Sequence, residues 1–130
     1  MRVLICGSRT WKEDGARDMV GTVIYGLISN FGWDSPENIT IIEGAANGAD
    51  REAGASAESA GCEVEEYPAN WDKHGKAAGP LRNQQMLDEG KPELVIAFVD
   101  KPLEESRGTN NMVTKAKAAG LPVYVVEKVS

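Results

Sequence analysis

The chain has 130 residues, of which 42% are hydrophobic and 26% charged, and this is the composition of an ordinary globular protein. Its length suits one domain, so we expect a single domain over residues 1–130. The formal net charge is −6, with 20 acidic and 14 basic residues. Because nucleic-acid binding through phosphate neutralisation needs clustered lysine and arginine, this balance disfavours nucleic acid as a partner.

Cysteine usage and the N-terminal segment narrow the class of protein further. Cys6 and Cys62 lie in or beside apolar runs, without the spacing of a metal site, so we expect buried free thiols, no metal and no cofactor. The first apolar run, at 3–6, is shorter than the core of a signal peptide and far shorter than the roughly 20 residues of a membrane span. We therefore expect a cytoplasmic protein without a membrane partner.

Strand and helix signals alternate along the chain. Apolar runs predict strands at residues 2–6, 39–42, 62–69, 93–99 and 121–128; the third alternates with polar residues and suits a sheet edge, and the fourth suits the centre. Apolar residues at helical spacing, with Gly and Pro boundaries, predict helices at residues 14–30, 49–61, 80–89 and 109–119, and a long loop at 70–80. The alternation predicts an α/β fold: a Rossmann-like, doubly wound, mainly parallel five-stranded sheet with helices on both faces.

The loop after the first predicted strand reads GSRTW and has the chemistry of a ligand site. Ligands of open parallel sheets bind at the carboxyl ends of the strands, where the winding reverses. Gly7 and Ser8 allow a tight turn and offer N–H and hydroxyl donors, while Arg9 can bind a phosphate or carboxylate in a bidentate manner. A plain turn with a solvated arginine is the alternative, and the G-x-G-x-x-G dinucleotide fingerprint is missing.

Two further loops each open a helix, where free N–H groups and the helix dipole favour an anion. Gly44 and Gly48 bracket the loop after the second strand, and Asp50 either caps the helix there or accepts a hydrogen bond from a ribose hydroxyl. Gly108 and Thr109 repeat the arrangement at the last helix, where a simple N-cap role for Thr109 is the alternative.

The stretch GPLRNQQML, at residues 79–87, places one arginine and three amides at the start of a helix. Its proline falls in the first turn, where the missing N–H costs nothing. The predicted topology turns this end toward the glycine loops, so Arg82 and Asn83 are expected to reach a bound phosphate or sugar. Gln84 and Gln85 point away and are expected to be solvated.

Aromatic residues near these loops admit two interpretations. Trp71 either stacks on a base or pins its loop to the body of the protein as a buried plug, and the burial of an indole favours the plug. Trp11 admits the same two interpretations, whereas Trp33 is expected to be structural. His74, the only histidine, is expected on the surface.

Four motifs in order carry a resemblance: GSRTW, GAANGAD, YPANWDKHGKAAGPLRNQQML and RGTNNMVTKAKAAGLPV. Together they resemble the YspA and YpsA-related branch of the SLOG superfamily, which joins the SMF/DprA and LOG proteins, over nearly the whole chain. The resemblance implies a Rossmann-like sheet with a site at the strand ends for a nucleotide, a nucleotide sugar or a related ligand. LOG enzymes of this superfamily cleave the N-glycosidic bond of nucleoside 5′-monophosphates.

The LOG motif, Pro-Gly-Gly-x-Gly-Thr-x-x-Glu, is only partly present. Its Gly-Thr corresponds to Gly108 and Thr109, but Glu105 and Ser106 replace the preceding glycine pair. Met112 falls where the resemblance places a catalytic glutamate, and a thioether cannot transfer a proton. The resemblance therefore favours a protein that binds a nucleotide, for sensing or sequestration, over one that hydrolyses it.

Two other functions stay open. As an N-glycosidase, the protein would use Arg82, which corresponds to the LOG catalytic arginine, with Asp50 as the carboxylate, or else Glu43 or Asp72. A DprA-like module for single-stranded DNA is disfavoured by the acidic charge balance. A homo-oligomer is compatible with the sequence, with Met86 and its neighbour Leu87 either in an apolar seam between copies or in the protein's own core.

Overall fold

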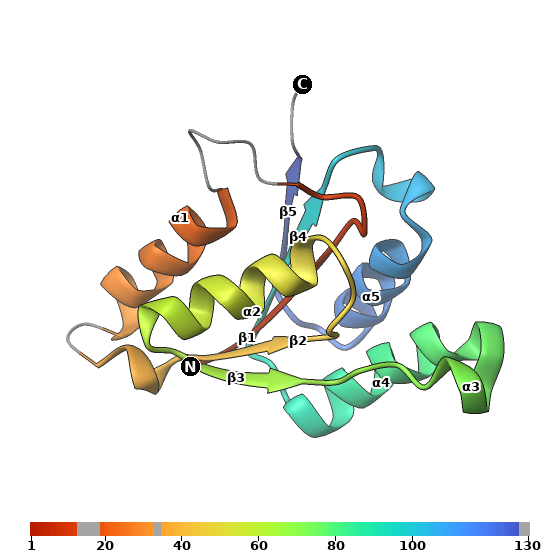
Figure 1. The fold of residues 1–130 in the computed structure, drawn as a ribbon, viewed down its shortest axis with the longest axis horizontal. Coiled ribbons are helices and arrows are strands. Elements are labelled where there is room, and N and C mark those ends of the chain that lie inside the picture. The colour runs from red at the N-terminus through yellow and green to blue at the C-terminus, as the bar shows by residue number, and fades with distance from the viewer. Residues whose placement is uncertain (13–18, 33–34, 128–130) are drawn as a thin grey trace.

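The computed structural model describes residues 1–12, 19–32 and 35–127. Its strands are β1 (Arg2–Gly7), β2 (Thr40–Glu43), β3 (Glu63–Glu66), β4 (Leu94–Val99) and β5 (Val123–Glu127). They form one parallel sheet in the order β3-β2-β1-β4-β5 (Figure 1). This order confirms the doubly wound, five-stranded Rossmann-like sheet, and the winding reverses between β1 and β4. The strand predicted for the edge, β3, lies at one edge of the sheet.

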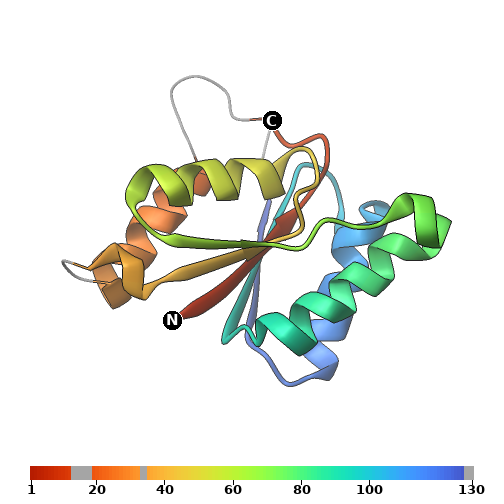
Figure 2. The same ribbon diagram turned by 60° about the horizontal axis from the view of Figure 1, so that its bottom comes forward.

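Helices cover both faces of the sheet, as the alternation predicts. The helices are α1 (Met19–Leu27), α2 (Ala49–Ala60), α3 (Trp71–His74), α4 (Ala78–Gly90) and α5 (Arg107–Ala118). Figure 2 shows α1 and α2 on one face and α4 and α5 on the other. None of the helices in the described part of the chain is long and apolar enough to cross a membrane.

The alternating directions of side chains on β1 explain the two cores. Val3 and Ile5 pack with α1 and α2, whereas Leu4 and Cys6 pack with α4 and α5. All four side chains are buried, which is why this strand is a continuous apolar run. Every residue of β4 is buried for the same reason.

One sequence prediction fails in the segment before α4, and within α4 the structure decides between two alternatives. The predicted loop at 70–80 contains α3, whose N-cap Asn70 accepts a hydrogen bond from the backbone N–H of Lys73 at 3.1 Å, followed by a 3-10 turn at Gly75–Ala77. The next helix, α4, then begins at Ala78 and places Pro80 in its first turn. Of the two places left open for Met86, the protein's own core is confirmed and a seam between copies is excluded, because Met86 is 1% exposed in the core under α4, with Leu87 packed against that core.

The remaining boundaries differ by a few residues at helix ends, where fraying and capping decide the assignment. The first helix is predicted at 14–30. The structure has α1 there, followed by a π-helical turn at Ile28–Gly32, and residues 14–18 lie outside the described residues. The last helix, α5, starts at Arg107, two residues earlier than predicted.

Gly7, at the end of β1, is required by close packing. A Cβ there would overlap the carbonyl oxygen of Phe98 on β4 and lie 2.6 Å from the Cβ of Ala49 on α2. We expect Gly7→Ala to lower the free energy of unfolding by about 1–3 kcal/mol or more, because backbone must shift to admit the methyl group. Urea unfolding of the variant and the wild type measures this loss.

The matched control is Gly26→Ala on α1, where a Cβ meets nothing within 4 Å. Alanine in a helix should raise the free energy of unfolding by about 0.5–1 kcal/mol there. Equal effects of the two substitutions would contradict the role of Gly7 in packing.

Candidate functional site

A cavity of about 630 Å³ lies at the carboxyl ends of β1 and β4, where the winding of the sheet reverses. Four segments line it: the end of β1 with the turn after it, the start of α2, the segment from α3 to α4, and the segment from Lys101 to the first turns of α5. Its volume falls within the range of about 300–1,000 Å³ that is typical of small-molecule sites.

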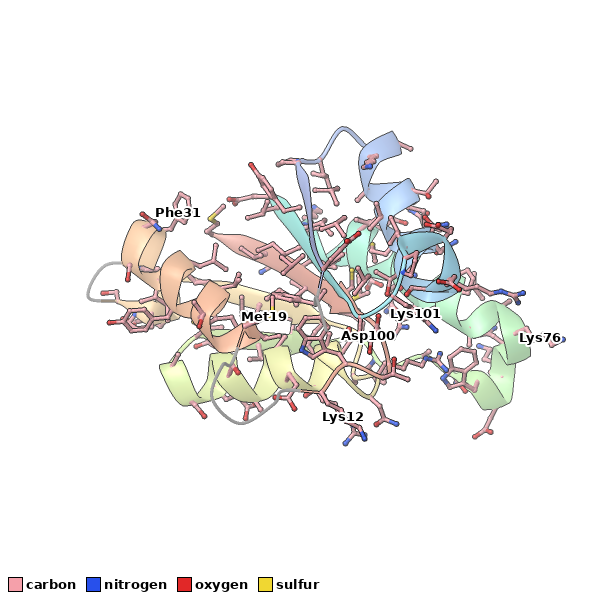
Figure 3. The ribbon with its side chains drawn as sticks, turned by 90° about the horizontal axis from the view of Figure 1, so that it is seen from above. Lys12, Met19, Phe31, Lys76, Asp100 and Lys101 are labelled. Atoms are coloured by element: carbon pink, nitrogen blue, oxygen red, sulfur yellow. The ribbon has the colours of Figure 1, made fainter. Side chains whose placement is uncertain are left out.

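The cavity is rich in positive charge although the protein is acidic. Its lining includes five cationic side chains, Arg9, Lys76, Arg82, Lys101 and Arg107, and two acidic ones, Asp50 and Glu105. Figure 3 shows Lys101 at the end of β4 and Lys76 at the α3 end of the molecule. Within the described ranges, none of the five forms an ion pair with a carboxylate. Like charges gathered without ion-pair partners favour an anionic ligand.

The start of α5 gives this cavity a place for an anion. The backbone N–H groups of Arg107, Gly108 and Thr109 have no partner within the helix, whose first such bond runs from Asn110 N to the oxygen of Ser106 at 2.7 Å. The helix dipole adds partial positive charge at this end. Since Ser106 occupies the N-cap position, the alternative role of Thr109 as N-cap is wrong.

Arg82 and Asn83 join three segments at the floor of the cavity. Arg82 Nη1 donates to the carbonyl oxygen of Gly44, and Arg82 Nε donates to Asn83 Oδ1 at 3.0 Å. Asn83 Nδ2 donates at 3.1 Å both to the oxygen of Gly108 and to Asn111 Oδ1. The start of α4 is thereby tied to the loop after β2 and to α5, as the predicted topology requires.

Gly44 and Gly48 support the cavity without lining it. A Cβ at Gly44 would overlap the guanidinium of Arg82 and lie 2.9 Å from Asp50 Oδ2. Gly48 has a φ of +81°, and a Cβ there would overlap the carbonyl oxygen of Ser8. Both glycines thus make room for neighbouring side chains and backbone, a role different from the direct ligand contact predicted from the sequence.

Asp50 is a buried carboxylate that lines the cavity. It is the second residue of α2, is 4% exposed, and accepts a hydrogen bond from the backbone N–H of Ala46 at 3.3 Å through Oδ2. The N-cap position of α2 belongs to Gly48, so the capping interpretation of Asp50 is wrong. Burial raises the pKa of Asp50 to about 6, against the opposing effect of the Arg82 charge.

The other candidate carboxylates do not line the cavity. Glu43, at the end of β2, is 1% exposed under α2, and its Oε2 accepts from the N–H of Ala45 at 3.0 Å. Burial raises the pKa of Glu43 to about 7. Asp72 and His74 are exposed on α3. Met112 is fully buried in the core under α5, so its position gives no access to a ligand.

The turn after β1 contributes Gly7, Ser8 and Arg9 to the lining. Ser8 is 3% exposed, its Oγ accepts from the N–H of Asp100 at 3.2 Å, and it lies 3.4 Å from the Oγ of Ser106. The turn is therefore fixed against the segment after β4. Of the ten ligand-binding residues predicted from the sequence, all except Gly44 and Gly48 line this one cavity.

The tryptophans differ from one another in their surroundings. Trp71 lines the cavity and is 47% exposed, so the buried-plug interpretation is wrong; the Cζ atom of Arg9 lies 5.1 Å from the centre of its ring. Trp11 is 2% exposed and packs edge-on against Phe98 with ring centres 5.4 Å apart, which is a structural role. Trp33 lies outside the described residues.

Sequence reasoning missed three of the five cations. Lys76, Lys101 and Arg107 are exposed, and single charged residues in loops are usually solvated, so composition alone does not single them out. The available signal was position, since Lys101 follows a buried strand and Arg107 begins the helix after it.

Comparisons with known proteins agree with this architecture. The sequence model of YAcAr, described as the YspA, cpYpsA-related SLOG family, matches residues 1–74. Gene 61 protein of Mycobacterium phage D29 is 35% identical over 127 residues, which cover 94% of this chain and 93% of that protein. The structure of DNA processing protein A (DprA) from Streptococcus pneumoniae superposes with a TM-score of 0.74 at 20% identity over 98% of this chain. The chain spans 50% of that DprA chain, and this likeness shows the fold alone.

The raised pKa of Glu43 makes stability depend on pH. Its pKa is about 7 in the folded protein against 4.5 as the ordinary value, so the folded state binds the proton more tightly and stability falls as pH rises through this interval. Glu43→Gln removes the ionisable group. We expect its free energy of unfolding, relative to that of the wild type, to rise between pH 4.5 and pH 8 by about 3 kcal/mol.

Thermal unfolding at both pH values measures this change, and a constant effect of the amide cancels in the difference. The control is Glu58→Gln, at an exposed position on α2, the helix that covers Glu43. Its stability relative to the wild type should differ little between the two pH values. If the difference in stability between Glu43→Gln and the wild type is equal at both pH values, the account is contradicted.

Proposed function

Because the chain belongs to the YspA, cpYpsA-related SLOG family, we propose that its cavity binds a nucleotide or a nucleotide-derived ligand. One observation carries the proposal: five cations without ion-pair partners among the described residues line a single cavity in a protein of net charge −6. Phosphates would relieve the mutual repulsion of these side chains.

The phosphates would lie at the start of α5. The free N–H groups of Arg107, Gly108 and Thr109 can bind phosphate oxygens without losing a bond inside the helix. Lys101 and Arg107 lie on the same segment and would add charge-assisted hydrogen bonds. The Thr109 hydroxyl forms no hydrogen bond with a described side chain, which supports a role as a further donor.

The sugar would lie over the floor formed by Asp50 and Arg82. The Asp50 carboxylate lines the cavity and can accept hydrogen bonds from ribose hydroxyls. Arg82 uses Nε and Nη1 within the protein, and its Nη2 forms no hydrogen bond with a described residue. Asn83 holds Arg82 in this orientation while it anchors α5.

The biological role that this site supports best is sensing or sequestration of a nucleotide. Met112 takes the position that the family resemblance gives to a catalytic glutamate, and it is fully buried. A binding role needs no group there. Cytoplasmic location and the absence of a cofactor belong to the same proposal.

A thermal-shift panel of AMP, ADP-ribose, NAD and a cyclic dinucleotide tests the proposal. A ligand at 100 times its dissociation constant adds about 2.7 kcal/mol to the free energy of unfolding, so the melting temperature should rise by several degrees. The increase should shrink with added salt, because the contacts are charged. If no compound of the panel raises the melting temperature, the cavity is not a nucleotide site.

Gly108→Leu is the variant that separates binding from folding. Gly108 lines the cavity, and a Cβ there meets nothing within 4 Å, so the leucine should leave the free energy of unfolding of the free protein within about 1 kcal/mol of wild type. The ligand-induced shift should disappear, because the side chain obstructs the start of α5. Thr109→Val and Arg82→Ala should reduce it, and Gln85→Ala, on the exposed face of α4, should not. Unchanged shifts in the first three variants would move the site elsewhere.

One observation favours a second candidate function, an N-glycosidase of nucleoside monophosphates or nucleotide sugars. Asp50 is a buried carboxylate with a pKa of about 6 beside Arg82, and perturbed carboxylates of this kind are common at catalytic sites. In such an enzyme Asp50 would stabilise the positive charge that develops on the sugar as the base departs. Arg82 would orient the phosphate.

Incubation with AMP and ADP-ribose decides between the two functions. Hydrolysis predicts that free adenine accumulates with time and that Asp50→Asn slows this by about 100-fold or more. A ligand that binds and is recovered intact after long incubation would exclude the hydrolase.

A further inference from the structure

We propose that Trp71 is a platform for the base of the bound nucleotide, and that Arg9 covers this platform until the base arrives. The inference rests on the proposed function and deepens it, because it specifies a ligand that carries an aromatic ring together with a phosphate. A sugar phosphate or a bare polyphosphate would satisfy the cations of the cavity but not the indole.

The position of Trp71 is the first argument. Its side chain lines the cavity, yet it is 47% exposed, so its burial in the protein does not account for its place. The far edge of the ring lies against α4, where a Cβ at Gly79 would approach Trp71 Cη2 to 3.4 Å. The indole is therefore held at the rim of the cavity by a contact with the first turn of α4.

The contact with Arg9 is the second argument. The Cζ atom of Arg9 lies 5.1 Å from the centre of the Trp71 ring, in the geometry of a cation–π interaction, and both residues line the cavity. Because Arg9 itself lines the cavity, the face of the indole that it covers is the one we assign to the base. A planar base can stack on that face, with the guanidinium moving aside or onto the other face of the base.

The relative strength of the two contacts allows this exchange. A cation–π contact at an exposed site changes an equilibrium by roughly 2- to 5-fold, whereas stacking of a base on an aromatic side chain changes binding by roughly 5- to 150-fold. A base can therefore displace the guanidinium at little cost.

The displaced Arg9 would still contribute to binding. Its charge acts on Asp50 and on Arg82 across the cavity, and it forms no ion pair with a described carboxylate. Once released from the indole, the guanidinium can bind a phosphate in a bidentate manner. Stacking of the base and neutralisation of the phosphate would then be coupled in one ligand.

Calorimetric titration with ADP-ribose, and with ribose 5-phosphate as the probe that lacks a base, tests the platform. Trp71→Ala should weaken ADP-ribose binding by roughly 5- to 150-fold and should not weaken the binding of ribose 5-phosphate, which has no base to stack. Trp71→Phe should restore much of the loss, because phenyl also stacks. Tyr124→Ala, which removes an exposed aromatic ring of β5 outside the cavity lining, should change neither.

Tryptophan fluorescence gives a second readout. ADP-ribose should change the emission of the wild-type protein, and the change should be lost in Trp71→Phe although the other two tryptophans remain. Equal binding of ADP-ribose to Trp71→Ala and wild type would overturn the platform and leave the nucleotide site standing. Failure of both probes to bind the wild type would overturn the nucleotide site itself, and the platform with it.

Discussion

The hydrogen bonds of Arg82 and Asn83 are the constraint on which the site depends. They join the loop after β2, the start of α4 and the start of α5, which are separated by 38 and 25 residues along the chain. Because Arg82 is largely withdrawn from solvent, its charge is retained by the nearby Asp50 carboxylate and by the carbonyl of Gly44. Gly44 must lack a side chain for this arrangement to exist.

The charge of the cavity differs in sign from the net charge of the protein. The protein has a net charge of −6, and yet five cations line the cavity, together with the N-terminus of α5. The Rossmann-like fold explains where such a cavity forms, at the reversal of the sheet, but many functions share this fold. It is the side chains of this cavity, with its buried Asp50 and its half-exposed Trp71, that support nucleotide binding.

The sequence predicts the sheet well because buried parallel strands read as short apolar runs and helices as periodic ones. It misses α3, since four residues are too few to show a helical period. It finds the loops that build the cavity because they follow the strands. It cannot show that Gly44 and Gly48 serve packing, that Trp71 stays exposed, or that Lys101 and Arg107 line the same cavity as Arg9 and Arg82, because these depend on distances between segments far apart in the chain.

Backbone amide NMR of the protein titrated with ADP-ribose tests the central claim most directly, since it reports on the N–H groups that would hold the phosphate. The account predicts downfield shifts of the Arg107, Gly108 and Thr109 amide protons, which have no partner within α5 in the free protein, with smaller changes around Asp50. Saturable binding that leaves these three amides unmoved would contradict it.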